Sequence, residues 1–375
     1  MTKEEKFPTL KKQLLELCRI AAPSKNEKPV RDYLYAFWEE RKDKGLSWHE
    51  ALQAPTGGDT TNILMTVEGK RPPVLLCAHM DTVPLGGASR INICESNGVL
   101  RSDGRTILGG DDRAGVALAL EMLNLCLADR DRQTSLEVLF TVQEEQGCLG
   151  SANCGFTLKS ILGYCLDGET PPPSLIIKSP RKERYTCTVR GRAAHAALEA
   201  AEGKNAICRA AKLINALPQG RVDDETTANI GSICGGGQTN IVPDDVRLTG
   251  ELRSFSKTRF TKYKEKIKDT CAQMEREDGY PVEMSWEHLY EGYTIKTDEE
   301  VIERFLRTCR EKNMEASLLA SPGGGDANNL NAQGISTVVF GIGMHEIHTP
   351  KEYLNLEEFF LAADLLQSVL IRENS

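Results

Sequence analysis

The sequence lacks the features that define several large protein classes. It has no run of about 20 apolar residues, the length needed to span a membrane, and its first residues, MTKEEKFPTLKKQ, lack the apolar core of a signal peptide. It contains no C-x-x-C pair, and 12 cysteines are few for 375 residues. We therefore expect no membrane partner, no disulfide framework and no structural zinc on cysteine. We interpret the cysteines as reduced, buried, small apolar side chains of a cytoplasmic protein.

Positive charge is also not in excess. The chain carries 46 Lys and Arg against 54 Asp and Glu, a net charge of −8. A nucleic-acid-binding protein needs a positive face to displace counterions, so no nucleic-acid partner is expected. A P-loop is absent, and GIGMHE (341–346) does not fit G-x-G-x-x-G, which excludes the common nucleotide sites. What remains is a folded globular chain with 40% hydrophobic and 27% charged residues.

The pattern of apolar residues predicts an α/β domain at 1–178 and 292–375. Short apolar runs that end in polar or Gly/Pro clusters predict buried strands at 74–78, 136–142, 161–166 and 337–340. Helical periodicity predicts helices at 5–20, 27–41, 113–127, 298–312 and 355–371. Strands alternating with helices indicate layers built on a mixed or parallel sheet.

The middle of the chain, 179–291, has a different texture. Its alternating and amphipathic segments predict strands at 185–190, 228–234, 246–254 and 281–289, with helices at 203–217 and 258–277. The order strand-helix-strand-strand-helix-strand is the ferredoxin-like pattern. We therefore expect a small α+β domain inserted into the α/β domain.

Metal-binding residue types follow each predicted buried strand. The strand ends are followed by His79-Met80-Asp81, Gln143-Glu144-Glu145, Asp167-Gly168-Glu169, and His345 and His348. Ligands of open α/β sheets bind at the carboxyl ends of the strands, and imidazole and carboxylate are zinc ligands. Asp111-Asp112 stands directly before the long helix, where a carboxylate is also an ordinary helix cap.

The combination is more informative than any one motif. Each taken alone fits an exposed loop, a solvated turn or a cap. Carboxylates that converge at one edge of a buried sheet would repel each other and raise their pKa values unless a cation held them. About five ligands suit two divalent ions with one bridging carboxylate.

Five ordered motifs carry a family resemblance, and they are HMDTVP (79–84), GGDDRAG (109–115), QEEQG (143–147), LDGE (166–169) and IHTPKEY (347–353). The chain resembles the aminoacylase/glutamate carboxypeptidase superfamily of two-zinc metallopeptidases over nearly its whole length. The inserted domain contributes GRAAHAA (191–197) and GGGQTNIVPDD (235–245). GGDDRAG and GGGDANNL (323–330) are most similar to the peptidase T branch, which comprises tripeptide aminopeptidases.

The resemblance implies a zinc-peptidase-like catalytic domain with a two-zinc centre. One zinc would be held by His79, Asp111 and Asp167, and the other by Asp111, Glu145 and His348, with Asp111 bridging. Mn²⁺ or Co²⁺ could fill the same ligand set. Arg113 departs from the family, which usually has Lys there, but this leaves the ligands untouched.

The resemblance also implies the catalytic groups. Glu144 would act as general base toward a water shared by the metals, and Asp81 would accept the other ring N–H of His79. His195 would polarise the substrate carbonyl, in its own or a partner subunit. Asn240, Arg253 and Gly324 would contact the substrate, although Arg253 also fits a surface salt bridge and Gly324 an ordinary loop.

These residues predict metal-dependent hydrolysis of short peptides from the amino end, by a tripeptide aminopeptidase. The inserted domain is expected to serve as a lid and to form a homodimer. Carboxypeptidase, dipeptidase and N-acyl amino acid deacylase activities stay open, as does a catalytically silent metal- or peptide-binding protein. A cysteine nucleophile at Cys77 is disfavoured because that residue lies in a buried apolar run.

Overall fold

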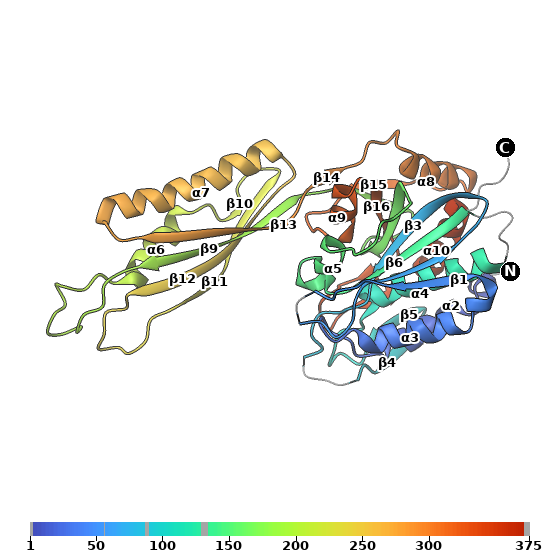
Figure 1. Ribbon diagram of the computed structural model, residues 1–375, viewed down its shortest axis with the longest axis horizontal. Coiled ribbons are helices and arrows are strands. Elements are labelled where there is room, and N and C mark those ends of the chain that lie inside the picture. The colour runs from blue at the N-terminus through green and yellow to red at the C-terminus, as the bar shows by residue number, and fades with distance from the viewer. Residues whose placement is uncertain (1–2, 56, 87–89, 129–133, 371–375) are drawn as a thin grey trace. The chain divides into compact units, whose positions relative to one another are not determined.

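The computed structural model describes residues 3–55, 57–86, 90–128 and 134–370. The chain separates into two compact units (Figure 1). Unit 1 comprises Met1–Lys178, Thr294–Ser321 and Gly325–Ser375, and unit 2 comprises Ser179–Tyr293 and Pro322–Gly324. Unit 2 is therefore an insertion into the sequence of unit 1, and each unit is described by itself.

Unit 1 is built on a mixed sheet. In its described residues this sheet has nine strands in the order β1-β2-β6-β3-β7-β16-β8-β14, with β15 beside β8. A second sheet has the order β17-β18-β5-β4. The bounds of these strands are β1 (Leu46–Glu50), β2 (Ile63–Val67), β3 (Arg71–His79), β4 (Ile93–Ser96), β5 (Val99–Ser102), β6 (Thr134–Thr141), β7 (Leu162–Gly168), β8 (Ser174–Ser179), β14 (Tyr293–Thr294), β15 (Ser317–Ala320), β16 (Ser336–Gly341), β17 (Met344–His345) and β18 (Tyr353–Asn355).

The centre of the large sheet is parallel. β6, β3, β7 and β16 are neighbours that run in the same direction, while β1 and β2 add an antiparallel edge. The side chains from Val74 to His79 on β3 are all buried, as are those from Leu162 to Leu166 on β7. Such continuous burial explains the unbroken apolar runs of the sequence. It also places the carboxyl ends of four strands at one edge of the sheet.

The helices of unit 1 pack around this sheet, with α4 against β3, β6 and β7, and α8 and α9 against β7 and β16. Their bounds, with the 3₁₀ turns, are α1 (Lys3–Lys6), α2 (Leu10–Cys18), α3 (Lys28–Glu39), η1 (Lys42–Lys44), α4 (Gly110–Ala128), η2 (Glu144–Gln146), α5 (Leu149–Ala152), α8 (Glu300–Glu311), α9 (Asp326–Ala332) and α10 (Leu356–Leu370).

Two sequence expectations need correction. The single helix predicted at 5–20 is split into α1 and α2, because Pro8 lacks the N–H that a continuous helix requires. The cysteines are also not uniformly buried, since Cys94, Cys208 and Cys234 are exposed. These three lie on β4, α6 and the second half of β11, where most neighbouring residues of the two strands are also exposed.

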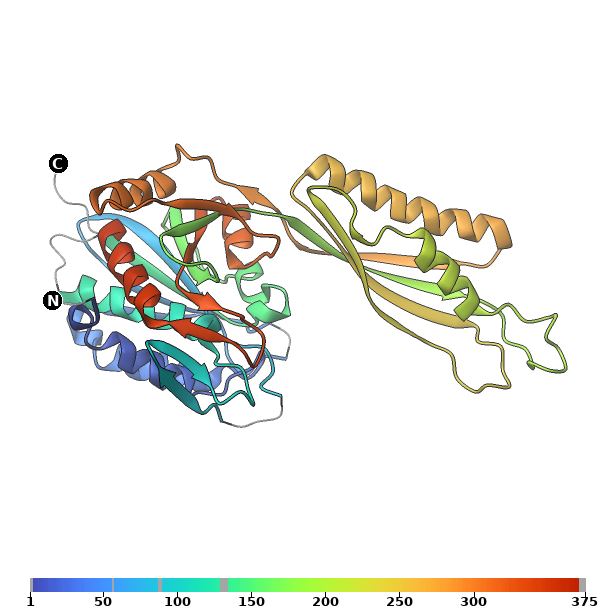
Figure 2. The same cartoon turned by 180° about the vertical axis from the view of Figure 1, so that it is seen from behind.

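Unit 2 has the predicted ferredoxin-like order of elements. Its bounds are β9 (Arg181–Arg190), α6 (Ala206–Ala216), β10 (Gly220–Arg221), β11 (Thr226–Gly235), β12 (Asp245–Ser254), α7 (Lys257–Asp278) and β13 (Val282–Tyr290). The sheet order is β10-β11-β12-β9-β13, and all neighbours are antiparallel. Both helices pack on the same face of this sheet (Figure 2). Their common core includes Tyr185, Val189, Leu248, Phe260 and Ile267.

The predicted fold class, a mixed-sheet α/β domain with an inserted α+β domain, is confirmed. Local sequence signals explain where the helices of unit 2 begin. Asn205 and Ser256 stand at their N-caps and accept hydrogen bonds from the backbone N–H groups of Cys208 and Arg259. Among the described residues, none of the helices combines the length and apolarity needed to cross a bilayer.

Candidate metal centre

The predicted ligands meet at the carboxyl-end edge of the large sheet. His79 is the last residue of β3, Asp167 lies near the end of β7, and Glu145 lies on the η2 turn that follows β6. Asp111 comes from the start of α4, and His348 comes from the loop between β17 and β18. Parallel strands end on the same side, so the topology itself gathers the first three.

The five side chains form two clusters that share one carboxylate. His79 Nε2 lies 2.8 Å from Asp111 Oδ1 and 3.8 Å from Asp167 Oδ1. His348 Nε2 lies 2.9 Å from Asp111 Oδ2 and 2.9 Å from Glu145 Oε1. Within each cluster the ligand atoms are all within 4.8 Å of one another. Asp111 therefore stands between the two, with one oxygen directed to each.

The donor set fits two divalent cations. Imidazole nitrogen and carboxylate oxygen are the ligands that zinc takes when cysteine is absent. His79 Nδ1 lies 3.1 Å from the main-chain oxygen of Asp81, which can only accept, so Nδ1 carries a proton and Nε2 is the ring nitrogen available to a cation. Glu145 Oε1 is buried and, despite its closeness to His348, makes no well-oriented hydrogen bond within the described residues. A cation would satisfy that oxygen.

The pKa values show that several of these side chains are unfavourable in their charged form when no cation is bound. Burial raises the pKa of Glu144 to about 8 and holds the pKa of Asp167 well above its usual range. The close carboxylates of Asp111 and Glu145 raise the pKa of His348 to about 10. For His79, the hydrogen bonds to Asp111 and Asp81 outweigh burial and raise its pKa well above normal. The cluster thus attracts positive charge, as protons or as metal.

A turn after β6 separates the two neighbouring glutamates. Gln143 has a left-handed backbone (φ 52), and the η2 turn begins at the next residue. Asp81 fixes this turn, since its two carboxylate oxygens accept hydrogen bonds from the N–H groups of Glu144 at 3.0 Å and Glu145 at 3.2 Å. Asp81 Oδ1 also lies 3.3 Å from His79 Nδ1. One buried carboxylate therefore orients a histidine and both glutamates.

Two further buried carboxylates hold the backbone of the centre. Asp112 belongs to neither cluster of the described residues and accepts hydrogen bonds from the N–H groups of His79 at 3.1 Å and Gly115 at 2.9 Å. Glu352 accepts from the N–H groups of Leu108, Gly109 and Asp111 at 2.8, 2.9 and 3.1 Å. Sequence reasoning assigned Glu352 no role. Its only signal was its place in the motif IHTPKEY, four residues after His348.

The other predicted residues lie in unit 2. His195 is exposed, and its Nδ1 accepts hydrogen bonds from the N–H groups of Ala197 and Leu198, both at 3.2 Å. Asn240 is also exposed. Arg253 Nε pairs with Glu251 Oε1 at 2.8 Å, the surface salt bridge that its position also allowed.

Two predicted positions have packing roles. Gly324 lies so close to Tyr290 that an added Cβ would sit 2.3 Å from the ring. His345, which follows a predicted strand but has no assigned role, lies with its Nε2 2.7 Å from Glu358 Oε2 and stacks on Tyr353 with the ring centroids 4.6 Å apart. It joins neither metal cluster among the described residues.

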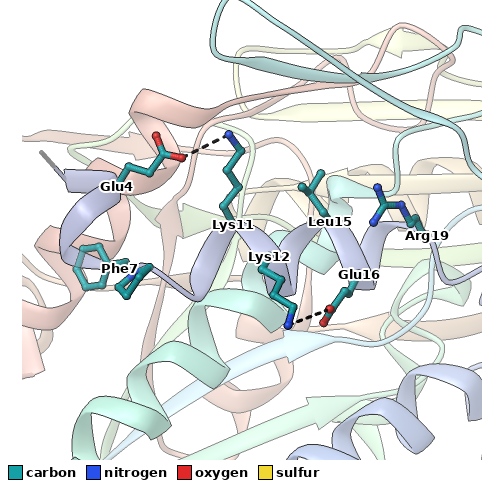
Figure 3. Close-up of a pocket in the computed structure, with 8 residues that line it drawn as sticks. Glu4, Phe7, Lys11, Lys12, Leu15, Glu16 and Arg19 are labelled. Atoms are coloured by element: carbon teal, nitrogen blue, oxygen red, sulfur yellow. Dashed lines mark hydrogen bonds and ion pairs between the residues drawn. The ribbon is translucent and has the colours of Figure 1, made fainter.

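A hollow on the surface of α1 and α2 is a separate feature (Figure 3). Phe7 and Leu15 line it together with charged side chains that pair among themselves, Lys11 with Glu4 at 3.4 Å and Lys12 with Glu16 at 3.9 Å. Satisfied surface ion pairs of this kind offer no chemistry. The hollow contains none of the residues of the candidate centre.

The sequence pattern of the peptidase family M20/M25/M40 matches residues 75–372. The chain belongs to this family. The chain is 31% identical over 367 residues to the uncharacterized protein YqjE of Bacillus subtilis. The alignment covers 96% of this chain and 97% of the relative. This match and the similarity to two solved structures together confirm the resemblance to peptidase T-like metallopeptidases that the motifs indicated.

Both structures match the M20 peptidase along almost its whole length. Aminopeptidase PepT from Bacillus cereus superposes with a TM-score of 0.85 at 30% identity, covering 97% of each chain. A tripeptidase from Staphylococcus aureus superposes with a TM-score of 0.88 at 30% identity, also covering 97% of each chain.

Proposed function

We propose that this protein is a two-metal aminopeptidase that hydrolyses short peptides, above all tripeptides, from the amino end. The observation that carries the proposal is the pair of three-residue clusters that share Asp111 and lie beside Glu144. The similarity to an aminopeptidase and a tripeptidase supports the substrate class.

The proposed ligands are His79, Asp111 and Asp167 for one cation and Asp111, Glu145 and His348 for the other. Zinc suits these donors, and Mn²⁺ or Co²⁺ would also fit. When bound, two such ions supply Lewis-acid activation of a water and of the scissile carbonyl. Everything else that the reaction needs has to come from the side chains of this chain.

Glu144 is the proposed general base. It is adjacent to the ligand Glu145, and its carboxylate lies within 4.8 Å of both Glu145 and His79. Burial raises its pKa to about 8, close to neutrality, where a group can both accept and return a proton. Glu144 would take the proton from the attacking water and deliver it to the leaving amine.

His195 is the proposed donor to the carbonyl oxygen. Because its Nδ1 accepts hydrogen bonds from two backbone N–H groups, the ring proton of the neutral form is on Nε2. An exposed Nε2–H can donate to an oxygen that gains negative charge in the transition state. The histidine would act in its own or a partner subunit. Asn240, Arg253 and Gly324 are proposed contacts of the peptide.

We also propose a homodimer formed through unit 2, in which this unit serves as the lid, and a cytoplasmic location. None of the cysteines in the described chain forms a disulfide, which is the state maintained by a reducing compartment.

A panel of substrates tests the proposed function. The metal-free protein is reloaded with zinc and assayed on free tripeptides, N-acetylated tripeptides, tripeptide amides, dipeptides and N-acyl amino acids, with and without chelator. We expect chelator-sensitive release of the first residue from free tripeptides and their amides, and no cleavage when the amino end is acetylated. Preferred cleavage of N-acyl amino acids would indicate a deacylase, and loss of activity on the amides a carboxypeptidase. Peptide binding without turnover would indicate the catalytically silent alternative.

A further inference from the structure

A third group of potential ligands lies next to the metal centre. Glu144, Cys148 and Asp326 come from the η2 turn, from the residue before α5 and from the first residue of α9. Their ligand atoms are all within 4.8 Å of one another, and Cys148 Sγ lies 3.2 Å from Glu144 Oε1. Of these three residues only Glu144 belongs to the machinery proposed above.

Asp326 is buried with unused hydrogen-bonding capacity. Its side chain is 1% exposed, and its Oδ2 accepts a hydrogen bond from Thr141 Oγ1. Its Oδ1 has no hydrogen-bond partner within the described part of the chain. Ser151 faces this carboxylate, but its hydroxyl donates to the main-chain oxygen of Cys148. A buried carboxylate oxygen without a partner is unfavourable unless something fills the space before it.

The backbone holds the Cys148 thiol in place. Cys148 has a left-handed conformation (φ 60), and its N–H donates to the main-chain oxygen of Glu144 at 2.7 Å. Its own carbonyl accepts from Asn329 Nδ2 at 3.1 Å. The residue is 2% exposed, so the sulfur is shielded from solvent where it lies, 3.2 Å from Glu144 Oε1.

We propose that Glu144, Cys148 and Asp326 form a third cation site that takes a thiophilic divalent ion such as Zn²⁺ or Cd²⁺. Ligand atoms around one tetrahedral zinc lie roughly 3.5 Å apart, given Zn–S and Zn–O bonds of about 2.3 and 2.1 Å. The separation of 3.2 Å between sulfur and Glu144 oxygen is close to this value. Binding would replace the S–H bond of Cys148 by an S–Zn bond and release that proton to water.

Occupancy of this site would take Glu144 out of the reaction. A carboxylate that coordinates the third ion cannot also accept the proton of the attacking water, so excess zinc should inhibit turnover. This consequence rests on the proposed function, in which Glu144 is the base. The binding of a third ion does not depend on it, and the two are measured separately.

Cobalt binding tests the site directly. The two main clusters contain only nitrogen and oxygen donors, so a sulfur-to-cobalt charge-transfer band in the near ultraviolet would report a thiolate ligand. The background for this test is the variant Cys94→Ala/Cys208→Ala/Cys234→Ala, which lacks the three exposed thiols. We expect it to bind three cobalt ions per chain and to show the band.

Adding Cys148→Ser to this background should remove the band and reduce the metal content to two ions per chain. Adding Asp326→Asn instead should keep the thiol but lower the affinity for the third ion by roughly tenfold or more, since a charged ligand is lost. A background variant without the band would overturn the proposal. So would a band that persists after Cys148→Ser.

Zinc inhibition is then measured on the same proteins, each relative to its own turnover at two equivalents. We expect the inhibitory zinc concentration to rise by roughly tenfold or more with Cys148→Ser, because a strong zinc ligand is removed. A protein that shows the cobalt band and is not inhibited by zinc would support the site and contradict the role of Glu144 as base.

Discussion

Buried carboxylates occur in both units of this molecule, but their partners differ. In unit 2, Lys264 and Arg181 hold the pKa of Glu183 below its usual range although burial opposes this. Arg209 does the same for the partly exposed Asp278, with its Nε 2.7 Å from the carboxylate. In unit 1, burial raises the pKa of Glu144 to about 8.

In the described chain, Arg113, a buried cation of unit 1, makes its hydrogen bonds to the main chain rather than to these acids. It is fully buried in the same region, and its guanidinium donates to the main-chain oxygens of Met80 and Ala22. Unit 2 thus neutralises its acids with its own side chains, whereas the centre of unit 1 leaves them without lysine or arginine partners in the described chain. Buried acids without such partners need positive charge from outside the polypeptide. This need is typical of a metal centre.

The largest expected effect is on Glu144, the proposed general base in unit 1, which is not a ligand of either main cluster. Glu144→Gln should lower kcat by about a thousandfold, since the amide cannot accept a proton, and should leave two metal ions bound. Kinetics and elemental analysis of the same preparation check both. The control is Glu169→Gln, an exposed acid of the nearby LDGE motif, which should stay active. A fully active Glu144→Gln would remove this residue from the reaction.

The next effect is on stability and concerns unit 2. Asp278→Asn should destabilise the fold by about 3 kcal/mol, because it leaves Arg209, 4% exposed in its side chain, without its counter-charge. Denaturation followed by the fluorescence of Trp286, which lies in unit 2, measures this. Glu283→Gln is the matched control, since its pair with Arg190 is exposed and should contribute nothing measurable. A change of metal content in Asp278→Asn would contradict the independence of the two charge systems.

His195 tests whether unit 2 takes part in the chemistry at all. His195→Ala should lower kcat by about a hundredfold, as expected for the loss of one donor to a developing negative charge, with metal content unchanged. Leu198→Ala, a neighbouring side chain that is 83% exposed, serves as the control. An unchanged rate in His195→Ala would confine catalysis to unit 1.

The smallest expected effect is the pH dependence of metal binding. The pKa of His348 is raised to about 10 in the metal-free protein, so metal must displace a proton, and affinity should rise about tenfold per pH unit for each proton released. Calorimetry in buffers of different ionisation enthalpy counts these protons. Metal binding to His348→Asn should release fewer protons than binding to the unchanged protein. Binding to His345→Asn should release the same number, because this residue is outside the clusters. An affinity that is flat between pH 6 and 8 would contradict this account.

The same shift has the opposite sign for the metal-free fold. A histidine whose pKa is raised on folding stabilises the protein fully below its unfolded pKa of about 6.5. That stabilisation is lost as the pH rises toward the folded value of about 10. The metal-free protein should therefore become less stable on mild alkalinisation, whereas the metal-loaded protein gains affinity over the same range.

Much of this fold was predictable because the strongest signals are local. The continuous apolar run of β3 and the alternation of β9 are set by which faces are buried, and both appear in the sequence. The grouping of His79, Glu145 and Asp167 followed from a rule about parallel strand ends. What distinguished Asp111 from Asp112 was a family pattern, because both are acidic and adjacent.

The remainder depends on contacts between distant segments. Nothing near Glu352 in the sequence indicates that it binds the N–H groups of residues 108–111, which lie more than 240 positions earlier. Asp326 and Cys148 were overlooked for the same reason, since their closeness arises only when α9 packs beside α5. The edge strand β1 and the strand β8 were also not predicted, because short pairings are determined by their neighbours rather than by their own residues.

The segment that ends in Glu352 also bears on when the protein can act. A growing polypeptide that stops short of it has neither the last imidazole nor the carboxylate that shapes the glycine loop before α4. Such a fragment would lack one ligand of the second cluster and the carboxylate that binds the backbone N–H of Asp111. The second cluster can therefore form only after His348 has been added to the growing chain.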